Sequence, residues 1–91
     1  MVAHDSRKGQ EMSTQSVIKE VRQERSYQDA KWGEQNHTPH YWLCVLMEEL
    51  GEAAKATIAD TANDYNYRHG LLHVAAVAVA AIESWDRGAK T

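Results

Sequence analysis

The chain has 91 residues, which is the size of one small domain. Its formal net charge is −3 and its basic residues form no cluster, so the composition does not predict a nucleic-acid-binding protein. We expect no secretory signal and no membrane span, because no apolar run reaches the roughly 20 residues that a spanning helix needs. The single cysteine, Cys44, lies in an apolar stretch, and we expect a buried thiol in a reducing cytoplasm.

The N-terminal part of the chain is polar up to residue 14 and shows no periodicity. We therefore expect a flexible tail over residues 1–14 and a single domain over residues 15–91. Hydroxyl residues near the boundary are suitable helix N-caps, and they precede a helix with a thin apolar side that is predicted to end at Gly33. Such a thin apolar side is typical of an outer helix. Its apolar residues are Val17, Ile18 and Val21.

A second helix is predicted from Pro39 to Ala59. Proline is favourable at the first position of a helix, and Thr38 can cap the helix before it. The apolar residues of this segment predict a broad core face. They are Trp42, Leu43, Leu46, Met47, Leu50, Ala53 and Ala54. A connection rich in Thr, Asn and Asp follows over residues 60–64.

A third helix is predicted from Asp64 or Tyr65 to Arg87, with Gly88 as its stop. Between Leu71 and Ile82 apolar residues occur at every angle around the helix axis, which indicates burial on more than one side. Three helices of one chain can hardly cover that surface. We therefore expect an all-α helical bundle of three main helices per chain, completed by homo-oligomerisation, with this helix near the centre of a homodimer.

An acidic stretch lies inside the second predicted helix and reads Glu48-Glu49-Leu50-Gly51-Glu52. Glu49 and Glu52 share a helical stripe with Val45 and Ala56. Two partly desolvated carboxylates would need a cation, a hydrogen-bond donor or a proton between them, and a hard divalent metal such as Mg²⁺ is the simplest source of that charge. The alternative is an exposed acidic patch, and the pattern leaves both interpretations open.

The acidic stretch resembles the Glu-Glu-x-x-Glu signature of the MazG-like nucleoside triphosphate pyrophosphohydrolases, a family of the all-α NTP pyrophosphatases. Two further runs are similar to segments of its small bacterial and phage members. They are Gln28-Asp29-Ala30-Lys31-Trp32-Gly33-Glu34-Gln35-Asn36-His37 and His73-Val74-Ala75-Ala76-Val77-Ala78. The resemblance covers roughly residues 21–87.

The resemblance implies a cytoplasmic, helical hydrolase that forms homodimers or homotetramers. It implies cleavage of a nucleoside triphosphate to monophosphate and pyrophosphate with Mg²⁺, or with Mn²⁺ in its place. By position, Glu49 and Glu52 would be metal ligands, and Glu48 an outer ligand or a base. The preceding loop would shape the base pocket, where Trp32 could stack on the base and His37 or Asn36 could bond to its edge. Trp32 could equally close the hydrophobic core beneath the loop, and Lys31 could contact phosphates or belong to a solvated face.

The chain departs from the family at the second acidic pair, Glu-x-x-Asp. Gly70 and His73 occupy the matching positions. His73 can bind a metal, although imidazole suits transition metals better than Mg²⁺, and it can equally be a hydrogen-bonded histidine at a helix interface. Asp60 and Asp64 are possible substitutes. A weak enzyme and a catalytically inactive nucleotide-binding or protein-interaction module both remain open.

Overall fold

Three α-helices form the molecule. The computed structural model describes the backbone of residues 3–58 and 64–90 and the side chains of residues 13–58 and 67–90. The helices are α1 (Ala3–Trp32), α2 (Pro39–Ile58) and α3 (Asp64–Asp86). No strand occurs in these ranges, so the predicted all-α class with three main helices is confirmed. None of the described helices is long and apolar enough to cross a membrane.

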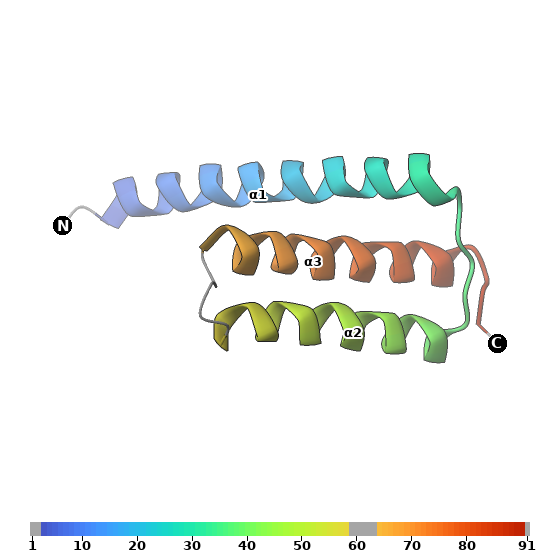
Figure 1. The fold of residues 1–91 in the computed structure, drawn as a ribbon. Coiled ribbons are helices and arrows are strands. Elements are labelled where there is room, and N and C mark those ends of the chain that lie inside the picture. Colours follow the sequence, from blue (N-terminus) through green and yellow to red (C-terminus); the bar gives the residue numbers. More distant parts are fainter. Residues whose placement is uncertain (1–2, 59–63, 91) are drawn as a thin grey trace.

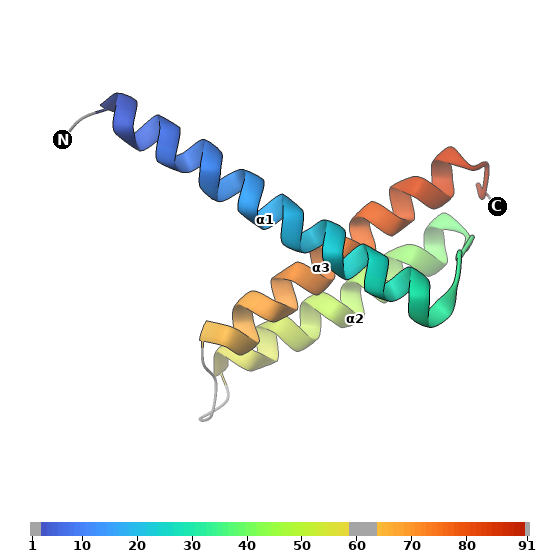
Figure 2. The ribbon, with the colours of Figure 1, turned by 90° about the horizontal axis from the view of Figure 1, so that it is seen from above.

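α3 is the middle helix of the three (Figure 1). α2 runs antiparallel to α3 as a hairpin, and α1 crosses α3 diagonally (Figures 1 and 2). α1 packs against α3 rather than against α2. The C-terminal half of α1 covers the hairpin, whereas its N-terminal half projects beyond it. Segments far apart in sequence therefore meet near the C-terminal end of α1.

The helix ends follow the local sequence. The Thr38 hydroxyl oxygen accepts a hydrogen bond from the backbone N–H of Tyr41 at 3.3 Å, which makes Thr38 the N-cap of α2. Gly33, with φ of 73°, ends α1, and its N–H donates to the carbonyl of Asp29 at 2.8 Å. Gly88 has φ of 103° directly after α3. These predicted ends are confirmed because each depends on neighbouring residues only.

The start of α1 differs from the prediction. The helix begins at Ala3, so it includes residues for which the pattern predicted a tail. Once one end of a helix is fixed by packing, adding further residues costs little, and no apolar stripe is required. The domain boundary at residue 15 stays a prediction. The predicted connection over residues 60–63, with Asp60, and the predicted helix end at Ala59 lie outside the described residues.

The core is small and lies between α2 and α3. Trp42, Val77 and Ala80 are buried together, and half-buried apolar side chains pack against them. The hairpin is closest at Gly70, where an added Cβ would lie 3.0 Å from the Cβ of Ala53. The missing side chain at Gly70 thus allows α2 and α3 to approach each other closely.

Much of the predicted core face of α2 is not covered. Leu43, Met47 and Leu50 are more than half exposed, and Ala54 is exposed, so placing them in the core was wrong for the single chain. The prediction of a buried Cys44 was wrong for the same reason, because no helix packs against that side of α2.

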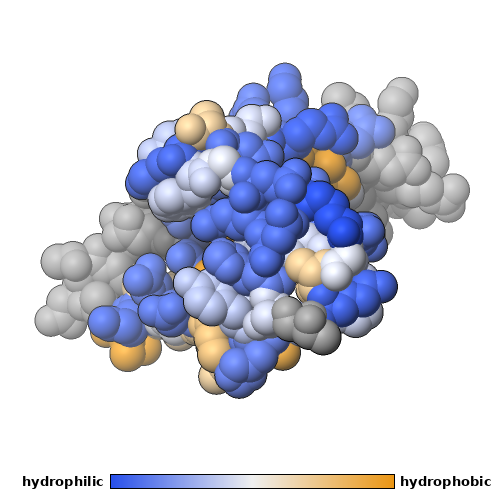
Figure 3. All heavy atoms as spheres, turned by 90° about the vertical axis from the view of Figure 1, so that its right-hand side faces the viewer, coloured by the Kyte–Doolittle hydropathy of each residue, from blue (hydrophilic) through white to orange (hydrophobic). Residues whose placement is uncertain are grey.

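Exposed apolar side chains of α3 lie on the side of the hairpin away from α1. We call the combined surface the outer apolar face, formed by Leu43, Met47, Leu50, Leu71, Ile82 and Trp85. By contrast, the end of the molecule with the α1–α2 loop is largely hydrophilic (Figure 3).

Candidate functional site

A pocket of about 610 Å³ opens between the three helices and the α1–α2 loop, and we call it the central pocket. Residues from all three helices and from the loop line it. Five residues that the sequence singled out are among them: Lys31, Trp32, His37, Glu49 and His73. The crossing of α1 over the hairpin brings these residues together, although they are spread over more than 40 positions of the chain.

His73 of α3 lies between two carboxylates at one end of the central pocket. Its Nδ1 is 3.6 Å from Oε2 of Glu49 on α2, and its Nε2 is 3.5 Å from Oε2 of Glu24 on α1. The side chains of Glu24 and Glu49 are 18% and 28% exposed, so both are largely removed from water. His73 therefore lies beside Glu49, one of the two glutamates that the resemblance assigns to the metal.

The other two glutamates of the acidic stretch lie elsewhere. Glu48 and Glu52 are exposed, and neither lines the central pocket. The expectation of a desolvated pair is therefore met by Glu49 but not by Glu52. The reason is the helical spacing, because Glu49 faces His73 of α3, whereas Glu48 and Glu52 point away from that direction around α2 and into solvent.

Aromatic rings line the opposite end of the central pocket. The ring of His37 stacks on Tyr41 with centroids 4.1 Å apart, and it meets the edge of Trp42 at 5.0 Å. Trp32 is about half exposed, and the ammonium of Lys31 lies 4.7 Å from its ring centroid. This end offers flat apolar surfaces with one cation beside them.

Trp42 lines the pocket with a buried donor. Its indole Nε1–H has no hydrogen-bond partner within the described part of the chain. A buried donor without an acceptor costs about 1–3 kcal/mol.

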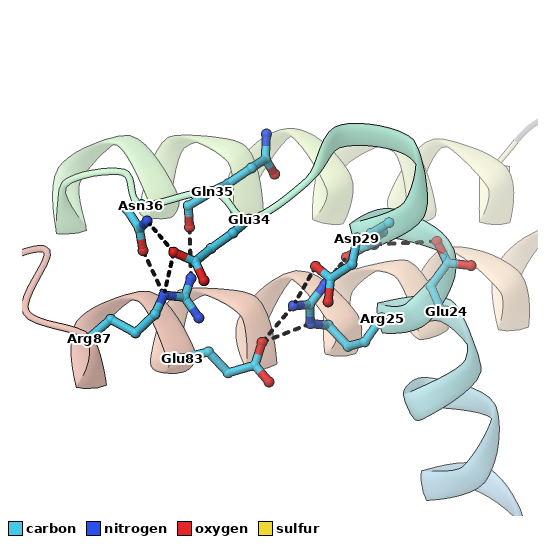
Figure 4. Close-up of polar contacts among 9 residues, drawn as sticks. Glu24, Arg25, Asp29, Glu34, Gln35, Asn36, Glu83 and Arg87 are labelled. Atoms are coloured by element: carbon cyan, nitrogen blue, oxygen red, sulfur yellow. Dashed lines mark hydrogen bonds and ion pairs between the residues drawn. The ribbon is translucent and has the colours of Figure 1, made fainter.

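Arg87 fixes the α1–α2 loop from the end of α3. Its Nε donates to Oδ1 of Asn36 at 2.7 Å, and Nη2 donates to the carbonyl of Gln35 at 3.1 Å (Figure 4). The amide nitrogen of Asn36 donates to Glu34 at 2.9 Å. Both polar side-chain atoms of Asn36 are therefore used in hydrogen bonds that hold the loop. Substrate binding by Asn36 stays a prediction.

Arg25 ties α1 to α3 beside the pocket. Its Nε donates to Glu83 at 3.1 Å and its Nη2 to Asp29 at 3.0 Å (Figure 4). Partial burial lowers the pKa of Arg25, but the hydrogen bonds to Glu83 and Asp29 outweigh that effect and raise the pKa above its ordinary value. The guanidinium therefore stays charged and holds α1 in position.

The described residues bring no group of three or more His, Cys, Asp or Glu side chains into an arrangement that could hold a metal ion. The two carboxylates beside His73 face opposite nitrogens of one ring, so they do not converge on a single point. The side chain of Asp64 lies outside the described part. Sequence reasoning missed Glu24 and Arg87, because their positions depend on how α1 and the loop cross α3.

Comparison with protein-family models, with curated proteins and with solved structures finds no match for this chain.

Proposed function

We propose that the protein is a MazG-like nucleoside triphosphate pyrophosphohydrolase, which converts a triphosphate to monophosphate and pyrophosphate. One observation carries the proposal. Lys31, Trp32 and His37, which the resemblance assigns to the substrate, line the same pocket as Glu49 and His73, which it assigns to the metal. A pocket of about 610 Å³ has the size of a typical small-molecule site, roughly 300–1,000 Å³.

The pocket has two chemically different ends, and a nucleotide has the same division. A base would lie among the aromatic side chains of Trp32 and His37, which both line the pocket. The triphosphate would then extend toward Glu49. Lys31, placed at the edge of the aromatic end, would contact a phosphate or the sugar.

Glu49 would hold the Mg²⁺ of a metal–triphosphate complex, with Glu52 as a second ligand from the solvent side one turn further along α2. One carboxylate in the pocket is compatible with this use, because Mg²⁺ in phosphate-transfer sites is commonly bound by one or two carboxylates together with substrate phosphates. When bound, the metal supplies charge neutralisation at the phosphate oxygens and a more acidic water molecule. Glu48 lies at the exposed edge of the stretch, where it can orient water.

The test is pyrophosphate release from a panel of canonical and modified triphosphates with Mg²⁺ or Mn²⁺. We expect turnover by the wild type and a loss of at least roughly 100-fold in Glu49→Gln. Asp86→Asn is the matched control, because it removes an exposed carboxylate of α3 away from the pocket. A folded preparation that turns over no triphosphate on the panel would contradict the proposal.

A second function is favoured by a separate observation. The described residues contain no prearranged metal site, and Gly70 stands where a second acid is expected. The same pocket would then serve a catalytically inactive MazG-like module that binds nucleotides or a protein partner. Calorimetric titration separates the two functions, since tight binding of a triphosphate without turnover supports the module.

We also propose a homodimer, or a homotetramer built from it, that covers the outer apolar face. Leu43, Met47 and Leu50 on α2 follow the 4–3 spacing of a helix–helix seam, and Ile82 and Trp85 face the same side from α3. α2 has 20 residues and is about 30 Å long, and two adjacent helices are about 20 Å wide. The resulting footprint, on the order of 600 Å², approaches the roughly 800 Å² that each partner buries in a stable interface.

A further inference from the structure

We infer that Glu24 of α1 is a positioning residue of the proposed site, which acts through His73 to hold Glu49 in the central pocket. This inference rests on the proposed function. It assigns a role to a residue outside the acidic stretch and outside the two other motifs.

Three helices each contribute one side chain to the arrangement. Glu24 comes from α1, Glu49 from α2 and His73 from α3, and all three line the central pocket. The imidazole ring of His73 has one carboxylate oxygen near each nitrogen, at 3.5 Å for Glu24 and 3.6 Å for Glu49. The ring thus lies between the two carboxylates, so Glu24 is placed to orient the ring that Glu49 faces.

Glu24 is itself held in place. Gln28, one turn further along α1, donates a hydrogen bond to Oε2 of Glu24 at 3.3 Å, and this is the oxygen nearest to His73. The side chain of Glu24 is the least exposed of the three, at 18%. It is therefore a fixed element of the pocket wall rather than a mobile surface carboxylate.

The acid comes from α1 because α3 has no room for one at position 70. An added Cβ at Gly70 would lie 3.0 Å from the Cβ and 3.3 Å from the Cα of Ala53. A glutamate there would push the two helices apart. The close approach of α2 and α3 thus removes one acidic position, and the crossing of α1 brings another carboxylate to the same side of the hairpin.

The arrangement also connects the two ends of the pocket. Lys31 and Trp32 lie two turns after Glu24 on the same rigid helix. A change in the position of α1 would therefore move the aromatic end and the His73 contact together. Glu24 links the segment proposed to bind the base with the glutamate proposed to hold the metal.

The experiment compares Glu24→Gln with Glu20→Gln in the full chain. Glu20 is the matched control because it lies one turn earlier on α1, pairs with Arg68, and does not line the central pocket. The first readout is the NMR signal of the His73 ring nitrogens at pH 7 without nucleotide, with Glu49→Gln as reference. The second readout is kcat and KM for the best triphosphate substrate.

We expect Glu24→Gln and Glu49→Gln to change the His73 ring signals by more than any change at the other four histidines. Glu20→Gln should leave the His73 ring signals unchanged. Glu24→Gln should lower kcat roughly 10–100-fold, with little change in KM. A loss of this size is usual when a residue that orients a functional side chain is removed. Melting temperatures of both variants show whether a general loss of folding is responsible.

Unchanged His73 signals in Glu24→Gln overturn the inference, even if the wild type is active. A fall in kcat that is equal in Glu20→Gln also overturns it. If the wild type turns over no triphosphate, the proposed function fails. The ring signals then decide alone, because a shift in Glu24→Gln that Glu20→Gln lacks still supports Glu24 as the residue that holds His73.

Discussion

At the scale of single residues, two helical glycines have opposite surroundings. Gly51 in α2 has no atom within 4 Å of an added Cβ, whereas Gly70 in α3 lies directly against Ala53. We expect Gly51→Ala to raise the free energy of unfolding by about 0.5–1 kcal/mol, because alanine loses less backbone entropy. We expect Gly70→Ala to lower it by about 1–3 kcal/mol, because the helices must separate.

Urea unfolding of the two variants tests this pair of expectations, and each variant serves as the control for the other. If Gly70→Ala stabilises the protein as much as Gly51→Ala does, the close approach of α2 and α3 at Ala53 is not a tight contact. In that case an acid at position 70 would also be tolerated, and the reason given for the role of Glu24 would be lost.

The sequence predicted correctly those residues whose role depends only on their neighbours in the chain. Thr38 caps α2 and Gly33 ends α1 because a cap or stop requires only the adjacent backbone. Glu24 was missed because its role depends on where α1 crosses α3. Cys44 was placed wrongly because its apolar neighbours belong to a surface that one chain leaves open.

At the scale of the helices, an ion pair joins α1 to α3. Arg68 donates to Glu20 at 3.0 Å, and this hydrogen bond lowers the pKa of Glu20 below its ordinary value, although desolvation opposes it. Because the pKa is lower in the folded state, the pair stabilises the protein above the unfolded-state pKa of about 4.3. The stabilisation is lost as the pH falls through the lower folded-state pKa.

We therefore expect the melting temperature of Glu20→Gln to be below that of the wild type at pH 7. The difference should stay constant down to about pH 5 and then shrink at lower pH. It should be small, because the pair is exposed. Thermal melts from pH 7 to pH 2 measure it, with Asp86→Asn as the comparison. A difference that grows on acidification would contradict the pairing.

The α1–α2 loop is fixed by contacts between elements, and Arg87 is central to them. Arg87→Met removes the donors to Asn36 and Gln35 and leaves the loop attached mainly through the buried Ser84, whose hydroxyl donates to the carbonyl of His37. Because His37 and Trp32 flank this loop, we expect the affinity for a triphosphate to fall several-fold to about tenfold, or roughly 1–1.4 kcal/mol.

Calorimetry with a non-hydrolysable triphosphate measures that loss of affinity. Arg22→Met is the control, since Arg22 is an exposed arginine of α1 away from the loop. Binding that is equally strong in Arg87→Met and in the wild type would mean that the loop does not contribute to the ligand site.

The three helices follow from hydrophobic periodicity and from the proline and glycine positions, which are local signals. Their crossing does not follow from those signals. α1 has only a thin apolar side, and such a stripe allows many angles against the hairpin. The partly buried pair Arg25–Glu83 ties α1 to α3 at the observed crossing, and it is not evident from the sequence because the partners are far apart in the chain.

At the scale of the whole molecule, the chain leaves a large apolar surface exposed. Within the described side chains the buried apolar residues are Trp42, Val77 and three alanines, whereas the six side chains of the outer apolar face are exposed. Exposed apolar surfaces of this extent are uncommon on monomers and usually mark an interface. The sequence predicted association from a helix that is apolar all round. α2 also contributes large side chains to the surface that a partner would cover.

Met47→Glu is the sharpest test of the homodimer. The side chain of Met47 is 71% exposed in the single chain, so a glutamate there should not disturb the fold of one protomer. In a dimer through the outer apolar face it would bury a charge near the middle of the interface, which should weaken association by at least roughly 100-fold. Light scattering over a concentration series should show a wild-type dimer and a monomeric variant with the same helix content.

Lys19→Glu is the control, because it also introduces a glutamate on the surface but lies on α1, away from the seam, so this variant should remain dimeric. A wild type that is monomeric at every concentration, or a Met47→Glu variant that associates as tightly, would mean that a different partner covers this face.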